Sequence, residues 1–354
     1  MAAAGAVVLA AGAISFTVGR AFTAKAPVAA MAPTKVADAD LVTGSIAART
    51  KPAPATSQSP ASAPLVGFPP ATVPVPFPTA SHGNVAAATP GPKCTNPDAL
   101  GVSRVVEIDT TGGPGFGFEQ YKAYDFLEPG EVVLTFDDGP WPVNTPAVLA
   151  ALAAQCLKAT FFPIGKHSTW HPEILKQVVA AGHTVGSHTW SHADLSKKTI
   201  DEGKDEIENG ISAVAISAGR PLAPLFRFPD LRETPELRAY LGQRNIGIFS
   251  TDLDSFDFKI KKPELVVASV MTKLQKRGKG IILMHDFQRS TALALPALLA
   301  QLKAGGYKVV WVKTKDTIAT LPQYDAAMQK VLVGQTADAR PTASVVRTIS
   351  GNVN

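Results

Sequence analysis

The chain has 354 residues, a formal net charge of +5 at pH 7 and only two cysteines. Its basic residues are scattered, and short basic runs such as Lys259–Lys262 carry no interleaved aromatic side chains. We therefore expect no nucleic-acid partner. Two cysteines exclude a disulfide-rich scaffold and a multi-cysteine zinc site. Cys94 and Cys156 either form one disulfide or leave Cys156 as a buried free thiol.

The first 19 residues are uncharged and mostly small or apolar. We expect residues 1–25 to be an export signal or membrane anchor, although no basic residue precedes the apolar run. A disordered alanine-rich terminus is the alternative. Residues 26–95 are rich in Ala, Pro, Thr, Ser and Val without a regular period, which predicts a Pro/Ala-rich low-complexity linker.

Residues 96–322 are long enough for one well-buried domain. Residues 323–354 are polar and weakly patterned, and they are predicted to be a flexible C-terminal tail. The N-terminal features favour an exported protein that is periplasmic, in the cell envelope or secreted, or one that is tethered to the membrane through the N-terminus. Recovery of the native protein in the cytosol would contradict this expectation. No feature of the sequence indicates an oligomer.

Short apolar runs alternate with helical patterns in the central part of the chain. The expected strands are Val132–Phe136, Ala159–Ile164, Thr184–Ser187, Leu225–Phe228, Ile246–Ser250, Gly280–Met284 and Lys308–Val312. The expected helices are Pro146–Gln155, Pro172–Ala181, Pro235–Gln243, Pro263–Arg277 and Ala292–Ala304. This alternation predicts parallel strands with helices outside. Because polar residues follow five strands, we expect a single distorted (β/α) barrel of about seven parallel strands rather than an open sheet.

Two adjacent carboxylates, Asp137 and Asp138, end the first expected strand. Neighbouring side chains on a strand point to opposite sides, so the two carboxylates are expected to have different roles. His188 and His192 have a spacing that would bring their imidazoles together on a helical turn. Two imidazoles and one carboxylate predict a catalytic metal site that leaves positions open for water and substrate. Zn²⁺ suits these ligands, and so do Co²⁺, Ni²⁺ and Fe²⁺.

These motifs resemble those of the polysaccharide deacetylase family, the carbohydrate esterases with a NodB homology domain. Thr135–Gly139 is similar to the first motif of the family, His188–His192 to the second and Ile281–Asp286 to the last. The resemblance spans roughly residues 130 to 312. It implies Asp138 as a metal ligand together with both histidines of the second motif.

The resemblance also implies the acid–base roles. Asp137 would be the general base that accepts a proton from the attacking water, and His285 the general acid that protonates the leaving amine. Arg227, in a segment similar to the third motif, would keep the catalytic carboxylate ionised and oriented. Asp257, in a segment similar to the fourth motif, would pair with His285 and raise its pKa.

The substrate-binding residues implied by the resemblance or by position are Leu283, Phe258, Trp141 and Asp230. Leu283 and Phe258 would line the pocket for the acetyl methyl group. Phe258 stands where the family commonly has tryptophan, and Asp230 where it often has an aromatic residue whose backbone N–H helps to bind the oxyanion. Trp141 would form a groove wall, or else pack in the core. The histidines expected to lie away from the metal ligands are His167, His171 and His183.

The sequence therefore predicts metal-dependent removal of N-acetyl groups from N-acetylglucosamine-containing glycans, with release of acetate. Chitooligosaccharide, peptidoglycan and poly-N-acetylglucosamine remain open as the acetylated substrate. One alternative is an O-acetyl esterase that acts on a polysaccharide such as xylan. Another is a non-catalytic glycan-binding module.

Overall fold

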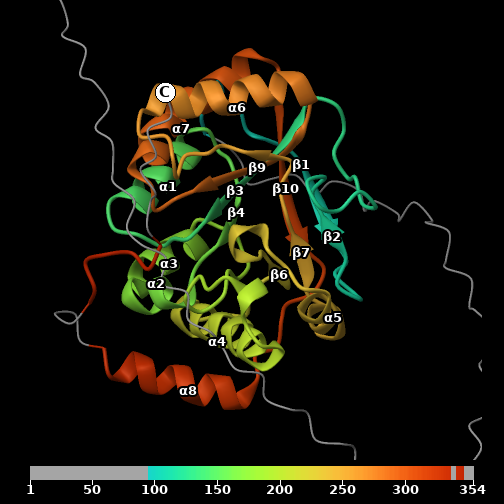
Figure 1. Cartoon of the computed structure of the whole chain (residues 1–354). Coiled ribbons are helices and arrows are strands. Elements are labelled where there is room, and N and C mark those ends of the chain that lie inside the picture. Colours follow the sequence, from blue (N-terminus) through green and yellow to red (C-terminus); the bar gives the residue numbers. More distant parts are fainter. Residues whose placement is uncertain (1–94, 336–339, 347–354) are drawn as a thin grey trace, which may run out of the picture. The chain divides into compact units, whose positions relative to one another are not determined.

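The computed structural model describes residues 95–335 and 340–346 (Figure 1). The expected signal or anchor over residues 1–25 lies outside the described residues, as does the expected linker over residues 26–95 apart from its last residue. Cys94 also lies outside them. Cys156 is disulfide-bonded, so the free-thiol alternative is wrong. Among the helices of the described ranges, none combines the length and apolar character that a membrane crossing needs.

Strands and helices alternate along the described chain, as the sequence predicts. The strands are β1 (Val102–Ile108), β2 (Gly115–Phe116), β3 (Glu131–Asp137), β4 (Thr160–Phe162), β5 (Thr184–Val185), β6 (Leu225–Phe226), β7 (Gly247–Phe249), β8 (Leu253–Asp254), β9 (Gly280–His285) and β10 (Lys308–Thr314). The helices are α1 (Asn144–Ala154), α2 (Gly165–Trp170), α3 (Pro172–Ala180), α4 (Ile200–Ala218), α5 (Pro235–Gln243), α6 (Pro263–Arg277), α7 (Arg289–Ala304) and α8 (Pro322–Val333). Two short 3-10 helices are η1 (Leu195–Lys197) and η2 (Pro229–Leu231).

Strand β3 is the centre of the sheet, and all of the pairings are parallel. It pairs with β9 over most of its length, with β4 near its C-terminal end and with β10 near its N-terminal end. Beyond these, β8 joins β9, β5 joins β4 and β1 joins β10. A bridge between Ser187 and Phe226 leads on to the second sheet, in which β6 pairs with β7 and β7 with β2. These pairings form the expected distorted barrel.

Both faces of β3 are buried, as is usual for a central parallel strand. Its outward side chains, such as Leu134, belong to the main core cluster beneath the helices. Val133 belongs to a second cluster with Phe162, Phe249 and Ile281 from three other strands, which is the interior of the barrel. Because side chains alternate along a strand, Asp137 continues the inward row of Val133. The fold therefore directs Asp137 into the mouth of the barrel.

Three helices of the structure were not expected from the sequence. These are α2, α4 and α8. Helix α4 carries Gly203 and Gly210, which weaken its intrinsic helical propensity.

Helix α8 shows that the expected flexible tail is wrong over residues 323–333. It packs beside α4 (Figure 1), burying Met328, and the Tyr324 hydroxyl donates to Asp205 at 2.7 Å. Only one side chain of α8 is buried, so the helix has no repeating pattern of apolar residues from which it could have been predicted.

Gly210 allows α4 to approach the segment that carries the expected metal-binding histidines. A Cβ atom at this position would lie 2.5 Å from the carbonyl carbon of Thr189. The amide of Trp190 donates to the carbonyl of Glu206 on the same helix at 2.8 Å. The absence of a side chain at Gly210 therefore helps to position the loop between His188 and His192.

We expect Gly210→Ala to lower the free energy of unfolding by about 1–3 kcal/mol, because the methyl group would overpack against backbone. Alanine would otherwise stabilise a helix by about 1 kcal/mol relative to glycine. Gly203→Ala is the matched control: the atoms nearest to its methyl group belong to the side chain of Leu237 and not to backbone, and we expect a smaller change. Urea unfolding measures both. A Gly210→Ala variant as stable as the parent would contradict the close approach.

Candidate metal and acid–base site

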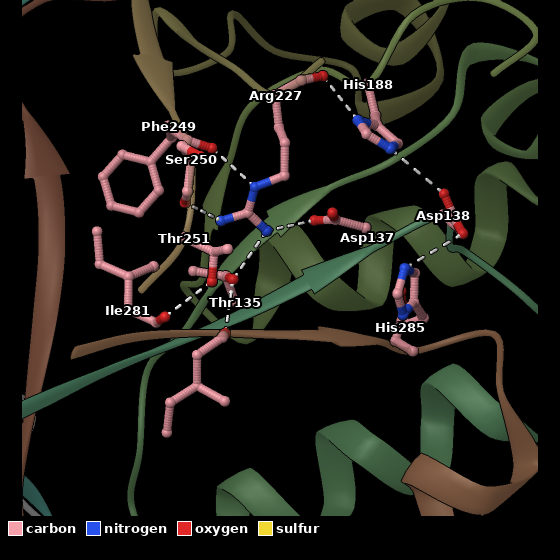
Figure 2. Close-up of polar contacts among 12 residues, drawn as sticks. Thr135, Asp137, Asp138, His188, Arg227, Phe249, Ser250, Thr251, Ile281 and His285 are labelled. Atoms are coloured by element: carbon pink, nitrogen blue, oxygen red, sulfur yellow. Dashed lines mark hydrogen bonds and ion pairs between the residues drawn. The ribbon is translucent and has the colours of Figure 1, made fainter. Parts of the chain in front are cut away.

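The site lies where the strands end. Asp137 is the last residue of β3, and His285 is the last residue of β9. His188, Arg227 and Asp257 lie in the segments that follow β5, β6 and β8. Because the strands are parallel, these C-terminal ends meet at one mouth of the barrel. Figure 2 shows Asp137, His188, Arg227 and His285, with His188 and His285 joined to Asp138 by dashed lines.

Arg227 is completely buried and uses each of its three nitrogens as a donor. Its Nε donates to the carbonyl of Phe249 at 2.7 Å, and its Nη2 to the carbonyl of Ser250 at 2.9 Å (Figure 2). Its Nη1 donates to Asp137 Oδ1 at 2.7 Å and to Thr135 Oγ1 at 2.8 Å. The bonds to β3 and to the end of β7 hold the Asp137 carboxylate in one orientation.

The environment of Asp137 raises the pKa of its carboxyl group to about 6. Burial has the largest effect and raises the pKa, while the positive charge of Arg227 opposes it. A carboxylate that titrates near neutrality is able both to accept and to release a proton. Asp137 therefore combines a fixed position with the proton affinity that general-base chemistry needs.

Asp138 forms a separate cluster with the two histidines. It has a left-handed backbone (φ 73°), so the chain turns away from the β3 direction at this residue. His188 Nε2 and His192 Nε2 each lie 3.5 Å from Asp138 Oδ1. All three candidate ligand atoms lie within 4.8 Å of one another. The neighbouring carboxylates therefore have different partners, as the sequence predicts.

The chemistry of this cluster fits a bound cation. His188 Nδ1 lies 2.7 Å from the carbonyl oxygen of Arg227 and must donate to it, because a carbonyl only accepts. Burial lowers the pKa of His188 to about 3, so the ring is neutral and its Nε2 bears a lone pair. That lone pair faces Asp138 Oδ1, a buried atom with no hydrogen-bond partner among the described residues. Ligand atoms about 2.0–2.1 Å from one tetrahedral Zn²⁺ would be about 3.3 Å apart, close to the spacing observed.

The two histidines come together on a loop and not on the helical turn that their spacing suggested. Thr189 and His192 both have left-handed backbone conformations, with φ of 67° and 58°. The amide of His192 donates to Thr189 Oγ1 at 3.0 Å. These two reversals fold the segment back, so that both imidazoles reach Asp138. The expected proximity is present, but its cause is local loop geometry.

His285 is hydrogen-bonded to Asp257 and lies next to the Asp138 cluster. Asp257 Oδ1 lies 2.6 Å from His285 Nδ1, and its Oδ2 accepts the backbone N–H of His285 at 2.7 Å. The hydroxyl of Thr291 also donates to Oδ2. Burial by itself would lower the pKa of His285, but the Asp257 carboxylate raises it to about 10. The imidazole is therefore protonated at neutral pH, with Nε2 3.9 Å from Asp138 Oδ2.

The expected substrate-binding residues are not all at the mouth. The Phe258 ring centroid lies 5.6 Å from that of His285, and Leu283 is buried two residues before His285 in β9. Trp141 is half-buried and packs against neighbouring histidine rings. Asp230 is exposed in η2, and no hydrogen bond or ion pair in the described ranges links it to the rest of the site. The structure thus places Phe258 and Leu283 beside the acid–base pair.

Asp286 is a site-supporting residue to which the sequence analysis gave no role. It is buried, and its Oδ1 accepts the Gly139 N–H at 3.0 Å while its Oδ2 accepts the Thr145 hydroxyl at 2.5 Å. A Cβ on Gly139 would lie 2.0 Å from Asp286 Oδ2, so only glycine fits there. Asp286 therefore holds the turn after Asp138. Its place directly after His285 was a signal that could have indicated this role.

His167 is a second supporting residue that was not foreseen. Its fully buried ring lies outside the metal cluster, and its Nδ1 donates to the carbonyl of Asp138 at 2.5 Å. Its Nε2 must then accept, and it receives the backbone N–H of Val345 at 3.1 Å, with the Ser344 hydroxyl at 3.3 Å. A segment near the C-terminus thus stabilises the backbone of a candidate metal ligand. This contact joins residues 178 positions apart, and nothing in the local sequence indicates it.

A family model described as polysaccharide deacetylase matches residues 127–247 of the chain. A chitooligosaccharide deacetylase of Bradyrhizobium is 34% identical over 155 residues, covering 44% of this chain and 70% of that protein. A peptidoglycan-N-acetylglucosamine deacetylase of Listeria monocytogenes is 32% identical over 181 residues, or 51% of this chain. The chain spans only 38% of the length of the Listeria protein.

A solved structure shares the fold over a larger part of the chain. It is the peptidoglycan deacetylase of Bdellovibrio bacteriovorus, which is 32% identical and matches with a TM-score of 0.56. The match covers 66% of this chain and 66% of that chain. The likeness therefore includes more than the segment that matches the family model.

We expect Asp138→Asn to weaken Zn²⁺ binding by at least about 100-fold, because even groups that only support a metal ligand contribute about 10- to 100-fold. Calorimetric titration of chelated protein with Zn²⁺ measures the affinity. Asp230→Asn removes an exposed carboxylate outside the cluster and should leave the affinity unchanged. Equal affinities of the Asp138→Asn variant and the parent would exclude Asp138 as a ligand.

Proposed function

The chain belongs to the polysaccharide deacetylase family, and we propose that it hydrolyses N-acetyl groups of N-acetylglucosamine-containing glycans and releases acetate. The single observation that favours this reaction is the pairing of His285 with Asp257 beside the Asp138 cluster. An amine is a poor leaving group unless it is protonated, and a histidine held protonated at neutral pH supplies that proton. An ester substrate would need this acid far less.

We propose that Asp138, His188 and His192 hold one divalent metal, with Zn²⁺ as the first choice for two imidazoles and a carboxylate. When bound, this ion would supply Lewis-acid activation of water and of the acetyl carbonyl. Asp137 accepts the proton of the attacking water, and Arg227 keeps that carboxylate oriented through the bond between Nη1 and Oδ1.

His285 then donates the proton on Nε2 to the amine as the carbon–nitrogen bond breaks. Asp257 holds the ring through Nδ1, so that Nε2 points towards the Asp138 side of the mouth. Phe258 and Leu283, which lie next to this imidazole, offer an apolar wall for the acetyl methyl group. The chain's own residues thus provide the general base, the general acid and the groups that position them.

The relatives are named for deacetylation of peptidoglycan and of chitooligosaccharide, and either glycan suits the proposed chemistry. We propose an acetylated glycan outside the cytoplasm as the substrate. Support comes from the apolar start of the chain and the proline-rich segment that follows it. Recovery of the native protein in a cytosolic fraction would contradict this location.

We expect the full chain, chelated and reloaded with Zn²⁺, to release acetate from an N-acetylated chitin oligomer. Asp137→Asn should lower kcat by about 10²- to 10⁴-fold, the usual contribution of a general base. Asp230→Asn should retain most of the activity, because its carboxylate is exposed and outside the cluster. Acetate release is measured in parallel from acetylated xylan. Activity on the xylan ester alone would refute the amide reaction, and unchanged turnover by Asp137→Asn would refute the assigned base.

The pH dependence of kcat/KM tests the assigned acid. His285 acts in its protonated form, so activity should fall as pH rises through its pKa of about 10. Asp257→Asn removes the negative charge that raises this pKa, and the alkaline limb should move to lower pH by at least about one unit. Thr291→Val retains the charge and should move the limb much less. An alkaline limb that stays in place in Asp257→Asn would show that another group is the acid.

A further inference from the structure

A cavity that shares no lining residue with the candidate active site lies beside β5, β6 and β10. It has a volume of about 330 Å³ and is lined by residues that precede β5 and β6 and by the end of β10. Its lining residues include His183, Arg220, Pro221, Trp311, Lys313 and Asp316. Its size is near the lower end of the range of about 300–1,000 Å³ for small-molecule sites, which suits one sugar unit.

His183 contributes a hydrogen-bond donor to this cavity. Its ring is nine-tenths buried, and its Nδ1 accepts the backbone N–H of Ala159 at 3.1 Å. Burial lowers the pKa of His183 to about 3, with the charge of Lys158 as a second cause, so the ring is neutral. A neutral imidazole that accepts at Nδ1 carries its proton on Nε2. This N–H has no protein acceptor within the described ranges.

The cavity also has an excess of positive charge. Arg220, Lys313 and Lys315 line it, against one carboxylate, Asp316. Lys315 is ion-paired with Asp109 at 3.3 Å. Arg220 and Lys313 have no ion-pair partner among the described residues. Two cations and a buried N–H donor therefore face a small space, a combination that favours an anionic group.

The remaining wall is apolar and rigid. The indole of Trp311 is fixed by a bond from its Nε1 to Thr184 Oγ1 at 2.9 Å, and Lys313 Nζ lies 5.3 Å from its ring centroid. Pro221 and Leu222 continue this wall. The cavity thus combines an aromatic surface with cations and with the Asp316 carboxylate, which is able to accept hydrogen bonds from hydroxyl groups. This combination matches a pyranose ring that carries one acidic substituent.

We propose that this cavity binds a monosaccharide unit that carries one carboxylate or phosphate group. Arg220, Lys313 and the His183 Nε2–H bind the anion, while Trp311 contacts the sugar ring. The site is separate from the acid–base residues. Its occupancy requires neither a metal nor turnover, and the inference goes beyond the proposed deacetylation.

Calorimetric titration of the full chain with glucuronic acid, glucose 6-phosphate, glucose and inorganic phosphate tests this proposal. We expect at least one of the two acidic sugars to bind at least about ten-fold more tightly than glucose and than phosphate. The better ligand identifies the anionic group. The double variant Arg220→Gln, Lys313→Gln should weaken that binding at least about ten-fold. Lys330→Gln, at an exposed position on α8, removes one charge elsewhere and should leave binding unchanged.

His183→Asn tests the donor while retaining a side-chain acceptor for the Ala159 N–H. It should weaken binding of the acidic sugar and leave acetate release unchanged. The proposal is overturned if no acidic sugar binds, if glucose or phosphate binds as tightly, or if the double variant binds like the parent. Acetate release is measured separately, so failure of binding is distinguishable from failure of the proposed deacetylation.

Discussion

The buried guanidinium of Arg227 is the constraint on which the rest of the site depends. An unpaired charge at this depth would cost several kcal/mol, so each of its donors must find an acceptor. The acceptors come from β3 and from the end of β7, which are far apart in the sequence. The carbonyl of the same residue accepts the Nδ1–H of His188. Correct packing of these strands thus orients the candidate base and one candidate metal ligand together.

Two adjacent carboxylates acquire different chemistry because the backbone reverses between them. Asp137 continues the inward row of β3, whereas Asp138 adopts a left-handed conformation and faces the histidines. The turn is supported from two directions. Asp286 binds the amide of Gly139, and His167 binds the carbonyl of Asp138. The supporting residues touch no ligand atom, yet they determine where the ligand carboxylate points.

Burial and a neighbouring carboxylate raise the pKa values of the base and the acid to different extents. Burial raises the pKa of Asp137 to about 6, and Asp257 raises that of His285 to about 10. Between these values the carboxylate is able to accept a proton while the imidazole still carries one. The same fold also places cations and an indole around a separate cavity beside β5, β6 and β10. The proposed sugar-binding cavity and the candidate active site therefore share no residue.

The sequence by itself determined the parallel strands and helices of the barrel and the strands that carry polar residues at their ends, because these depend on alternation within short segments. The choice of Asp138 as the metal ligand beside His188 and His192 came from the resemblance to the family and not from a local period. Tertiary structure alone decided the rest. Helix α8 and the bond from Val345 to His167 depend on partners distant in the chain, and the histidine loop depends on left-handed residues and on Gly210. These features are stabilised by packing between residues distant in the sequence, and no local sequence pattern predicts such packing.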